Sequence, residues 1–121
     1  MSWNSQAAIH YLDWHASGHS IGRCAQYTRE AIEHGGIHLE RHASAKDYGR
    51  SLLNAGFVEV HETHDYRAGD VVVIQPIPGH PHGHMAMYDG HQWVSDFKQR
   101  TLYPGGSYRS YAPSYTVYRH P

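Results

Sequence analysis

The sequence has little charge, one cysteine and no long apolar run. The single cysteine excludes an internal disulfide framework. Lysine and arginine together number 10 against 11 aspartates and glutamates, and the net charge of −1 excludes a strongly basic nucleic-acid binder. The longest aliphatic run, Val71–Ile74, is much shorter than the roughly 18 residues of a membrane-spanning helix, so we expect no membrane insertion. The N-terminus has no basic segment before its apolar residues, which argues against a Sec-type signal peptide and predicts a protein made in the cytoplasm.

Histidine and tyrosine, with 13 and 10 residues, take the place of the missing charge. The length of 121 residues predicts one domain, 1–121. Its first part, about 4–57, predicts helices near residues 5–15, 20–34 and 44–54, with Asn4 or Ser5 and Ser20 as N-caps and Gly56 as a stop. Its second part, about 68–119, predicts strands over 71–75, 84–88, 92–97 and 115–119. Helices followed by an antiparallel sheet are typical of the α+β class.

Cys24 is the candidate nucleophile, because it lies four residues after Ser20 in the first turn of a predicted helix. A helix N-terminus carries partial positive charge and unpaired backbone N–H groups, which favour a thiolate and can hold an oxyanion. Gly22 leaves room for a substrate, and Tyr27 lies one turn further on, where it can line a cleft or pack in the core. The alternative for a lone cysteine is a small buried apolar residue.

His84 is the candidate base, because it opens a predicted strand that is followed by a hairpin turn. The base needs a partner that fixes its tautomer, and the hairpin register selects that partner. With a three-residue loop over 88–90, His84 faces Val94, and the carboxylate of Asp96 lies diagonally on the same face. With a two-residue loop, His84 faces Ser95 and Asp96 points away. The sequence leaves both registers open.

Three histidines at alternate positions offer a different chemistry. His80, His82 and His84 can face one way and bind zinc, with Cys24 or Asp96 as the fourth ligand. The intervening proline and glycine make this segment loop-like, however, and spacings such as CxxC or HExxH do not occur. We therefore expect a histidine loop beside a substrate cleft, with His82 contacting the substrate and with no metal or other cofactor.

Five segments follow one another over about residues 18–100: GRCAQYTREAI, AKDYGRSLLNAGF, GDVVVIQP, GHMAMYDG and QWVSDFKQ. In this order they resemble the NlpC-type and CHAP-type cysteine amidases of bacterial cell walls, and in particular the small amidases delivered by type VI secretion. The resemblance implies a papain-like fold, with N-terminal helices packed on a small antiparallel sheet. It implies Cys24 as nucleophile, His84 as general base and Asp96 as the third member. Ser95, which faces His84 in the two-residue register, stays the alternative third member or a substrate contact. The Arg23–Cys24 dipeptide departs from the Asp-Cys-Ser of many secreted relatives.

The resemblance implies a cysteine peptidase that hydrolyses an amide bond in the stem peptides or cross-links of peptidoglycan. It further implies an antibacterial effector that acts in the periplasm of a target cell, and a cognate immunity protein that covers Cys24 and His84. A phage-type lysin is the alternative with the same chemistry. A non-catalytic wall-binding module and a histidine-rich zinc-binding protein are the alternatives from other classes.

Overall fold

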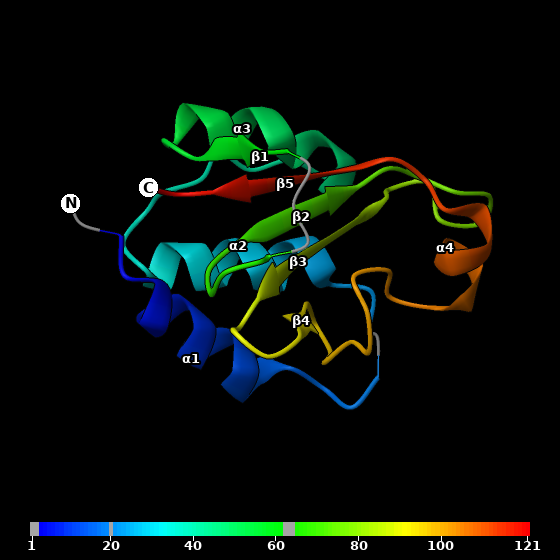
Figure 1. Ribbon diagram of the computed structural model, residues 1–121, viewed down its shortest axis with the longest axis horizontal. Helices are drawn as coiled ribbons and strands as arrows, with labels where there is room; N and C mark the ends of the chain where they lie inside the picture. Colours follow the sequence, from blue (N-terminus) through cyan, green and yellow to red (C-terminus); the bar gives the residue numbers. More distant parts are fainter. Residues whose placement is uncertain (1–2, 20, 62–64) are drawn as a thin grey trace.

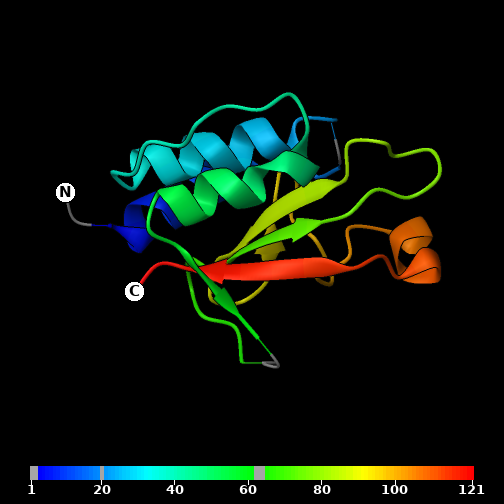
Figure 2. The same ribbon diagram turned by 90° about the horizontal axis from the view of Figure 1, so that it is seen from above.

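Three helices lie on one face of a five-stranded sheet in the computed structural model, which describes residues 3–19, 21–61 and 65–121 (Figures 1 and 2). These helices are α1 (Ser5–His15), α2 (Cys24–His34) and α3 (Tyr48–Asn54), and a 3-10 turn at Ala45–Asp47 leads into α3. A fourth helix, α4 (Gly106–Tyr111), lies at one end of the sheet. None of the described helices is long and apolar enough to cross a membrane.

The sheet is antiparallel throughout. Its strands lie in the order β1 (Val58–Val60), β5 (Tyr115–Arg119), β2 (Val71–Ile74), β3 (His84–Tyr88) and β4 (Trp93–Val94). Alternation along the strands divides the apolar side chains between two cores. Val73 and Met85 pack toward the helices, whereas Val72 and Ala86 belong to the core on the other face. The predicted α+β arrangement of helices on an antiparallel sheet is therefore confirmed.

The first helix has both predicted ends, whereas the third ends as predicted but begins at Tyr48, after a 3-10 turn. The Asn4 side chain caps α1 by accepting the N–H of Ala7 at 3.0 Å. At the end of α3, the N–H of Phe57 donates to the carbonyl of Leu52 at 3.0 Å, and Gly56 has a φ of +99°. This is the hydrogen-bond pattern of a Schellman motif, which requires a left-handed residue such as glycine.

The second helix begins later than predicted. The expected N-cap, Ser20, lies outside the described residues, and α2 begins at Cys24 itself, with Arg23 in the cap position and no side-chain cap. Thr28 and Ile32 are fully buried and fix which face of α2 lies against the sheet. The candidate nucleophile is therefore the first residue of its helix.

Both predicted registers of the β3–β4 hairpin are wrong. Met87 lies opposite Val94, so the loop contains four residues, 89–92. The carboxylate of Asp89 accepts the N–H groups of His91 and Gln92, each at 2.8 Å, and this local turn lengthens the loop. Regular pairing in the returning strand covers only β4, instead of the predicted 92–97.

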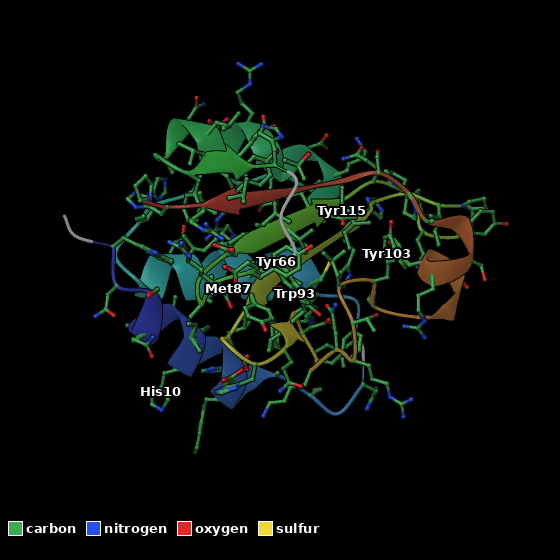
Figure 3. All side chains as sticks on the ribbon, viewed as in Figure 1. His10, Tyr66, Met87, Trp93, Tyr103 and Tyr115 are labelled. Atoms are coloured by element: carbon green, nitrogen blue, oxygen red, sulfur yellow. The ribbon has the colours of Figure 1, made fainter. Side chains whose placement is uncertain are left out.

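Two elements lie in segments that the sequence predicts as connections. β1 pairs with β5, and α4 occupies part of the tyrosine-rich segment before β5. Aromatic residues of this segment and of other parts of the chain pack in pairs over the helix-free face of the sheet (Figure 3). Tyr66 lies 5.1 Å from Trp93 and Tyr103 lies 5.8 Å from Tyr115, measured between ring centroids. Tyr66 and Tyr103 therefore pack against the second core, whereas Tyr115 is exposed.

We predict that Gly83→Ala destabilises the protein more than Gly79→Ala. Both glycines have a positive φ, +71° and +85°, so in both variants the alanine is strained in the left-handed backbone conformation. Only at Gly83 would the new Cβ collide with the carbonyl oxygen of Ile74, because nothing lies within 4 Å of a Cβ at Gly79. Urea denaturation should show that the free energy of unfolding falls by roughly 3 kcal/mol for Gly83→Ala and by about 1 kcal/mol for Gly79→Ala. Equal losses in the two variants would contradict the predicted collision at Gly83.

Candidate active site

The start of α2 and the start of β3 bring Cys24 and His84 to one cleft. Thr28, one turn after Cys24, is buried and donates from its hydroxyl to the carbonyl of Met85 at 3.4 Å. The backbone of Met85, next to His84, is also a hydrogen-bond partner of the Cys24 thiol. Cys24 and His84 line the same cavity. The two residues that the sequence predicts as a pair therefore line one cleft.

Burial decides the charge state of the Cys24 thiol. It raises the pKa of Cys24 to about 11, and the nearby negative charge of Asp96 acts in the same direction. Backbone hydrogen bonds, first from Met85 and then at the N-terminus of α2, lower the pKa but do not offset burial. The start of α2 therefore acts in the predicted direction, but burial outweighs it and favours the neutral thiol.

The partner of His84 is Gln99. The Nε2 of His84 lies 2.7 Å from the Oε1 of Gln99, and both residues are buried. The amide nitrogen of Gln99 donates to the carbonyls of Thr101 and Leu102, both at 3.1 Å, which assigns its oxygen to the side facing His84. His84 must then carry its proton on Nε2 and donate it to Gln99. Nδ1 is left unprotonated, as a base requires.

Burial also lowers the pKa of the His84 imidazole below its ordinary value of 6.5, although the hydrogen bond with Gln99 and the charge of Asp96 raise it in part. Tyr108 packs 6.0 Å from the His84 ring, between ring centroids, and helps to exclude water from it. At neutral pH, His84 is therefore uncharged and able to accept a proton.

Asp96, the expected partner of His84, makes other hydrogen bonds. Its carboxylate accepts the N–H groups of Ile21 and Arg23 at 2.8 and 2.9 Å, and the hydroxyl of Ser95 donates to it at 3.2 Å. The four-residue hairpin loop is the reason, because it changes which side chains of the returning strand reach His84. Asp96 therefore positions the loop that leads into Cys24, and the expectation that it orients His84 is corrected.

The other expected contacts divide into two groups. Gly22 and His82 line the cleft, in agreement with the sequence prediction. Ser95 has no exposed surface, so it cannot contact a substrate. Tyr27 packs against the helix-side core and not against the cleft. Burial thus excludes the expected substrate contact of Ser95, and Tyr27 takes the core position that the sequence left open as its alternative.

The cleft has two arms that meet at Cys24. The helical arm, of about 680 Å³, lies between α2 and residues 41–48. The loop arm, of about 370 Å³, lies between residues 79–84 and residues 104–108. Gly22, Cys24 and His82 line both arms, so a substrate chain can extend to either side of the nucleophile.

The histidine loop does not assemble a zinc site in the described residues. In residues 3–19, 21–61 and 65–121, no three His, Cys, Asp or Glu side chains are placed to hold a metal ion. The Nδ1 of His82 lies 2.6 Å from the hydroxyl of Ser44, and Nε2 of His84 is engaged by Gln99. His80 instead packs against Tyr108, with 5.3 Å between ring centroids.

Sequence reasoning missed Gln99 and Tyr108. Gln99 follows β4 in an irregular segment, where its backbone N–H donates to the carbonyl of Trp93 at 2.8 Å. Tyr108 lies on α4, in a stretch whose glycines and proline predict a loop. Neither position belongs to a periodic pattern, so only the three-dimensional structure brings them to His84.

The chain is similar to known proteins in sequence and in structure. The model of the NlpC/P60 family matches residues 11–115. A chain in the crystal structure of the native type VI effector–immunity complex Tae3–Tai3 from Ralstonia pickettii is 53% identical, with a TM-score of 0.92, over 98% of this chain and 100% of that one. In the selenomethionine form of the complex, the identity is 57% and the TM-score 0.88, over 93% of this chain and 98% of that one. No curated protein matches the chain.

We predict that His84 occupies the Nε2–H tautomer and titrates below pH 6.5 in the wild-type protein, because Gln99 accepts from Nε2 and burial disfavours the cation. Nitrogen-15 NMR of the histidine ring measures both properties.

Gln99→Glu should raise the pKa of His84, since a carboxylate in this place stabilises the imidazolium. Gln6→Glu, the same change on the exposed surface of α1, should not shift it. An Nδ1–H tautomer in the wild type would contradict the assignment.

Proposed function

The chain belongs to the NlpC/P60 family, and from this premise we propose that it is a peptidoglycan amidase of the type VI effector class. The reaction is hydrolysis of an amide bond in stem peptides or cross-links. One observation carries the proposal: Cys24 at the first residue of α2 shares a cleft with His84, whose Nδ1 is left free to act as a base. Cys24 is thus the nucleophile, His84 the general base and Gln99 the residue that orients it.

The chemistry is acyl transfer in two steps. As the sulfur of Cys24 bonds to the substrate carbonyl carbon, the thiol proton passes to Nδ1 of His84. The oxyanion that forms accepts a hydrogen bond from the backbone N–H of Cys24 at the start of α2. The carbon–nitrogen bond then breaks, and His84 returns the proton to the leaving amine. Water, deprotonated by His84, hydrolyses the thioester and restores the thiol.

A neutral cysteine–histidine pair fits this order of events. Because burial keeps both groups uncharged, the proton moves together with the attack and is not transferred beforehand. A bound substrate that displaces water from the cleft preserves this condition. The buried Gln99 supplies orientation without adding a charge.

We predict that the wild type releases soluble muropeptides from purified sacculi and that Cys24→Ala releases none. His84→Ala should reduce the rate by at least about a hundredfold, because general base catalysis is lost. His10→Ala, an exposed histidine on α1, is the matched control and should leave the rate unchanged. Mass spectrometry of the products identifies the bond that is cut.

Equal release of muropeptides by the wild type and Cys24→Ala would contradict the assignment of Cys24 as the nucleophile. Binding to sacculi without any release, by either protein, would favour the non-catalytic wall-binding module.

The matching complexes pair the effector with its immunity protein, and this supports a cognate immunity protein for this chain. We infer that the partner covers the junction of the two arms at Cys24, and that the enzyme acts in the periplasm of a target cell. The type VI relatives favour this assignment over a phage-type lysin.

Expression in a susceptible bacterium tests the assignment. We expect lysis when the wild type is directed to the periplasm, no lysis when it stays in the cytoplasm, and no lysis with Cys24→Ala in either compartment. Coexpression of the cognate immunity protein in the periplasm should restore growth. Survival of cells that carry active enzyme in the periplasm, with no inhibitor present, would contradict both the compartment and the need for a partner.

A further inference from the structure

The two arms of the cleft differ in charge. The loop arm is lined by glycine, proline, histidine and aromatic residues, together with Cys24 and Ser107, and none of its described lining residues is Lys, Arg, Asp or Glu. The helical arm is lined by three arginines, Arg23, Arg29 and Arg41, and by one carboxylate, Glu30. An excess of positive charge therefore lies on one side of Cys24 only.

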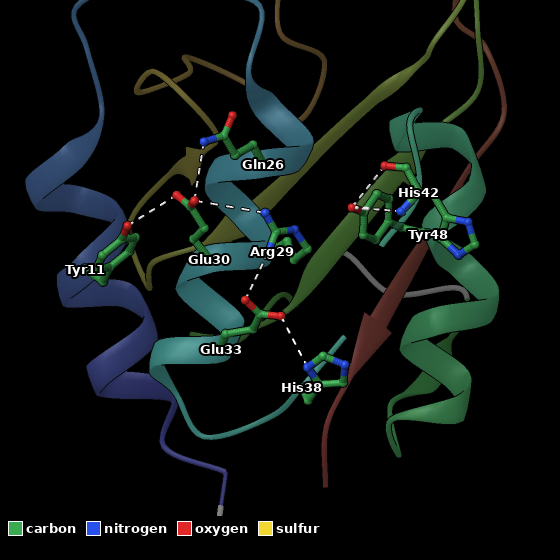
Figure 4. A network of polar contacts seen from close by, with 8 residues as sticks. All are labelled: Tyr11, Gln26, Arg29, Glu30, Glu33, His38, His42 and Tyr48. Atoms are coloured by element: carbon green, nitrogen blue, oxygen red, sulfur yellow. Dashed lines mark hydrogen bonds and ion pairs between the residues drawn. The ribbon is translucent and has the colours of Figure 1, made fainter. Parts of the chain in front are cut away.

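The carboxylate of Glu30 already has hydrogen-bond and ion-pair partners. It accepts hydrogen bonds from Tyr11 and Gln26, each at 3.3 Å, and lies 4.0 Å from the guanidinium of Arg29 (Figure 4). Arg29, which is buried, is held in turn by Glu33 at 2.9 Å. Arg29 thus lies between two glutamates of α2, and among the described residues neither glutamate forms an ion pair with Arg23 or Arg41.

Arg23 and Arg41 are those remaining cations. Both side chains are exposed, and in the part of the chain that the structure describes neither guanidinium has an ion-pair or hydrogen-bond partner. Arg23 directly precedes the nucleophile, and Arg41 lies in the segment that forms the other wall of the helical arm. A guanidinium presents a planar pair of N–H donors that matches a carboxylate, and an uncharged arm on the other side of Cys24 gives a carboxylate one preferred side.

We propose that the helical arm is a carboxylate-binding site, in which Arg41 and Arg23 bind a free carboxylate of the peptide substrate while the loop arm takes an uncharged segment. The proposal deepens the amidase function and rests on it for the identity of the substrate. The carboxylate has three chemical sources in a stem peptide: the α-carboxylate of a γ-linked glutamate, the free carboxylate of a diamino diacid such as diaminopimelate, or the carboxylate at the end of the chain. In each case the contact sets the side on which the substrate lies and acts mainly on KM.

The test compares a purified cross-linked stem-peptide dimer with three analogues, in which the glutamate α-carboxylate, the free diaminopimelate carboxylate or the terminal carboxylate is a carboxamide. We expect the wild type to lose about tenfold in kcat/KM, through KM, on one of the three analogues, and that analogue identifies the source. Arg41→Gln and Arg23→Gln should cleave the dimer and this analogue at nearly equal rates. Arg50→Gln removes an exposed arginine of α3 outside the cleft and should keep the wild-type preference.

The same four peptides are titrated by calorimetry against Cys24→Ala protein, with and without Arg41→Gln, so that binding is measured without turnover. Equal affinity of Cys24→Ala protein for the dimer and all three analogues would overturn the carboxylate site. A preference that survives both Arg41→Gln and Arg23→Gln would overturn it as well. A preference that Arg41→Gln abolishes supports the site even if the wild type cleaves none of the peptides, an outcome that would count against the amidase function alone.

Discussion

Asp96 is fully buried, and one oxygen of its carboxylate accepts the backbone N–H groups of Ile21 and Arg23. Its backbone carbonyl accepts the N–H of Ser17 at 2.8 Å, so one residue fixes both ends of the loop between α1 and α2 to the segment after β4. A buried carboxylate is stable only when its oxygens are bonded, and here the backbone of that loop supplies the bonds. The position of Cys24 relative to the sheet depends on this contact.

The charge of Asp96 also acts on the two residues that we propose as nucleophile and base. It raises the pKa of both Cys24 and His84, which favours a proton on each of them. Burial opposes the cation on His84 and reinforces the neutral thiol, so the two effects leave an uncharged pair. Gln99 completes this balance, because an amide fixes the tautomer of His84 without adding the negative charge that would stabilise an imidazolium. An uncharged pair of this kind agrees with the proposed mechanism, in which the proton moves during the attack on the substrate.

Local patterns in the sequence predicted the elements that local interactions determine. The ends of α1 and α3 follow from a capping side chain and from a glycine with a positive φ, both readable within a few residues. The hairpin register was not predictable from Asp89-Gly90 alone, because the Asp89 side chain closes a longer loop. Gln99 was missed for a related reason: its orientation depends on carbonyls of an irregular segment that follows no period.

The meeting of two arms at Cys24 constrains what the site can accept. A pocket with one arm would suit a substrate that ends at the scissile bond, whereas here chain can lie on both sides of the sulfur. Peptide cross-links and internal stem bonds have this property. The three residues common to both arms, Gly22, Cys24 and His82, lie where any molecule seated across them would close both paths at once. The proposed two-sided substrate and the proposed immunity protein would therefore compete for the same three residues.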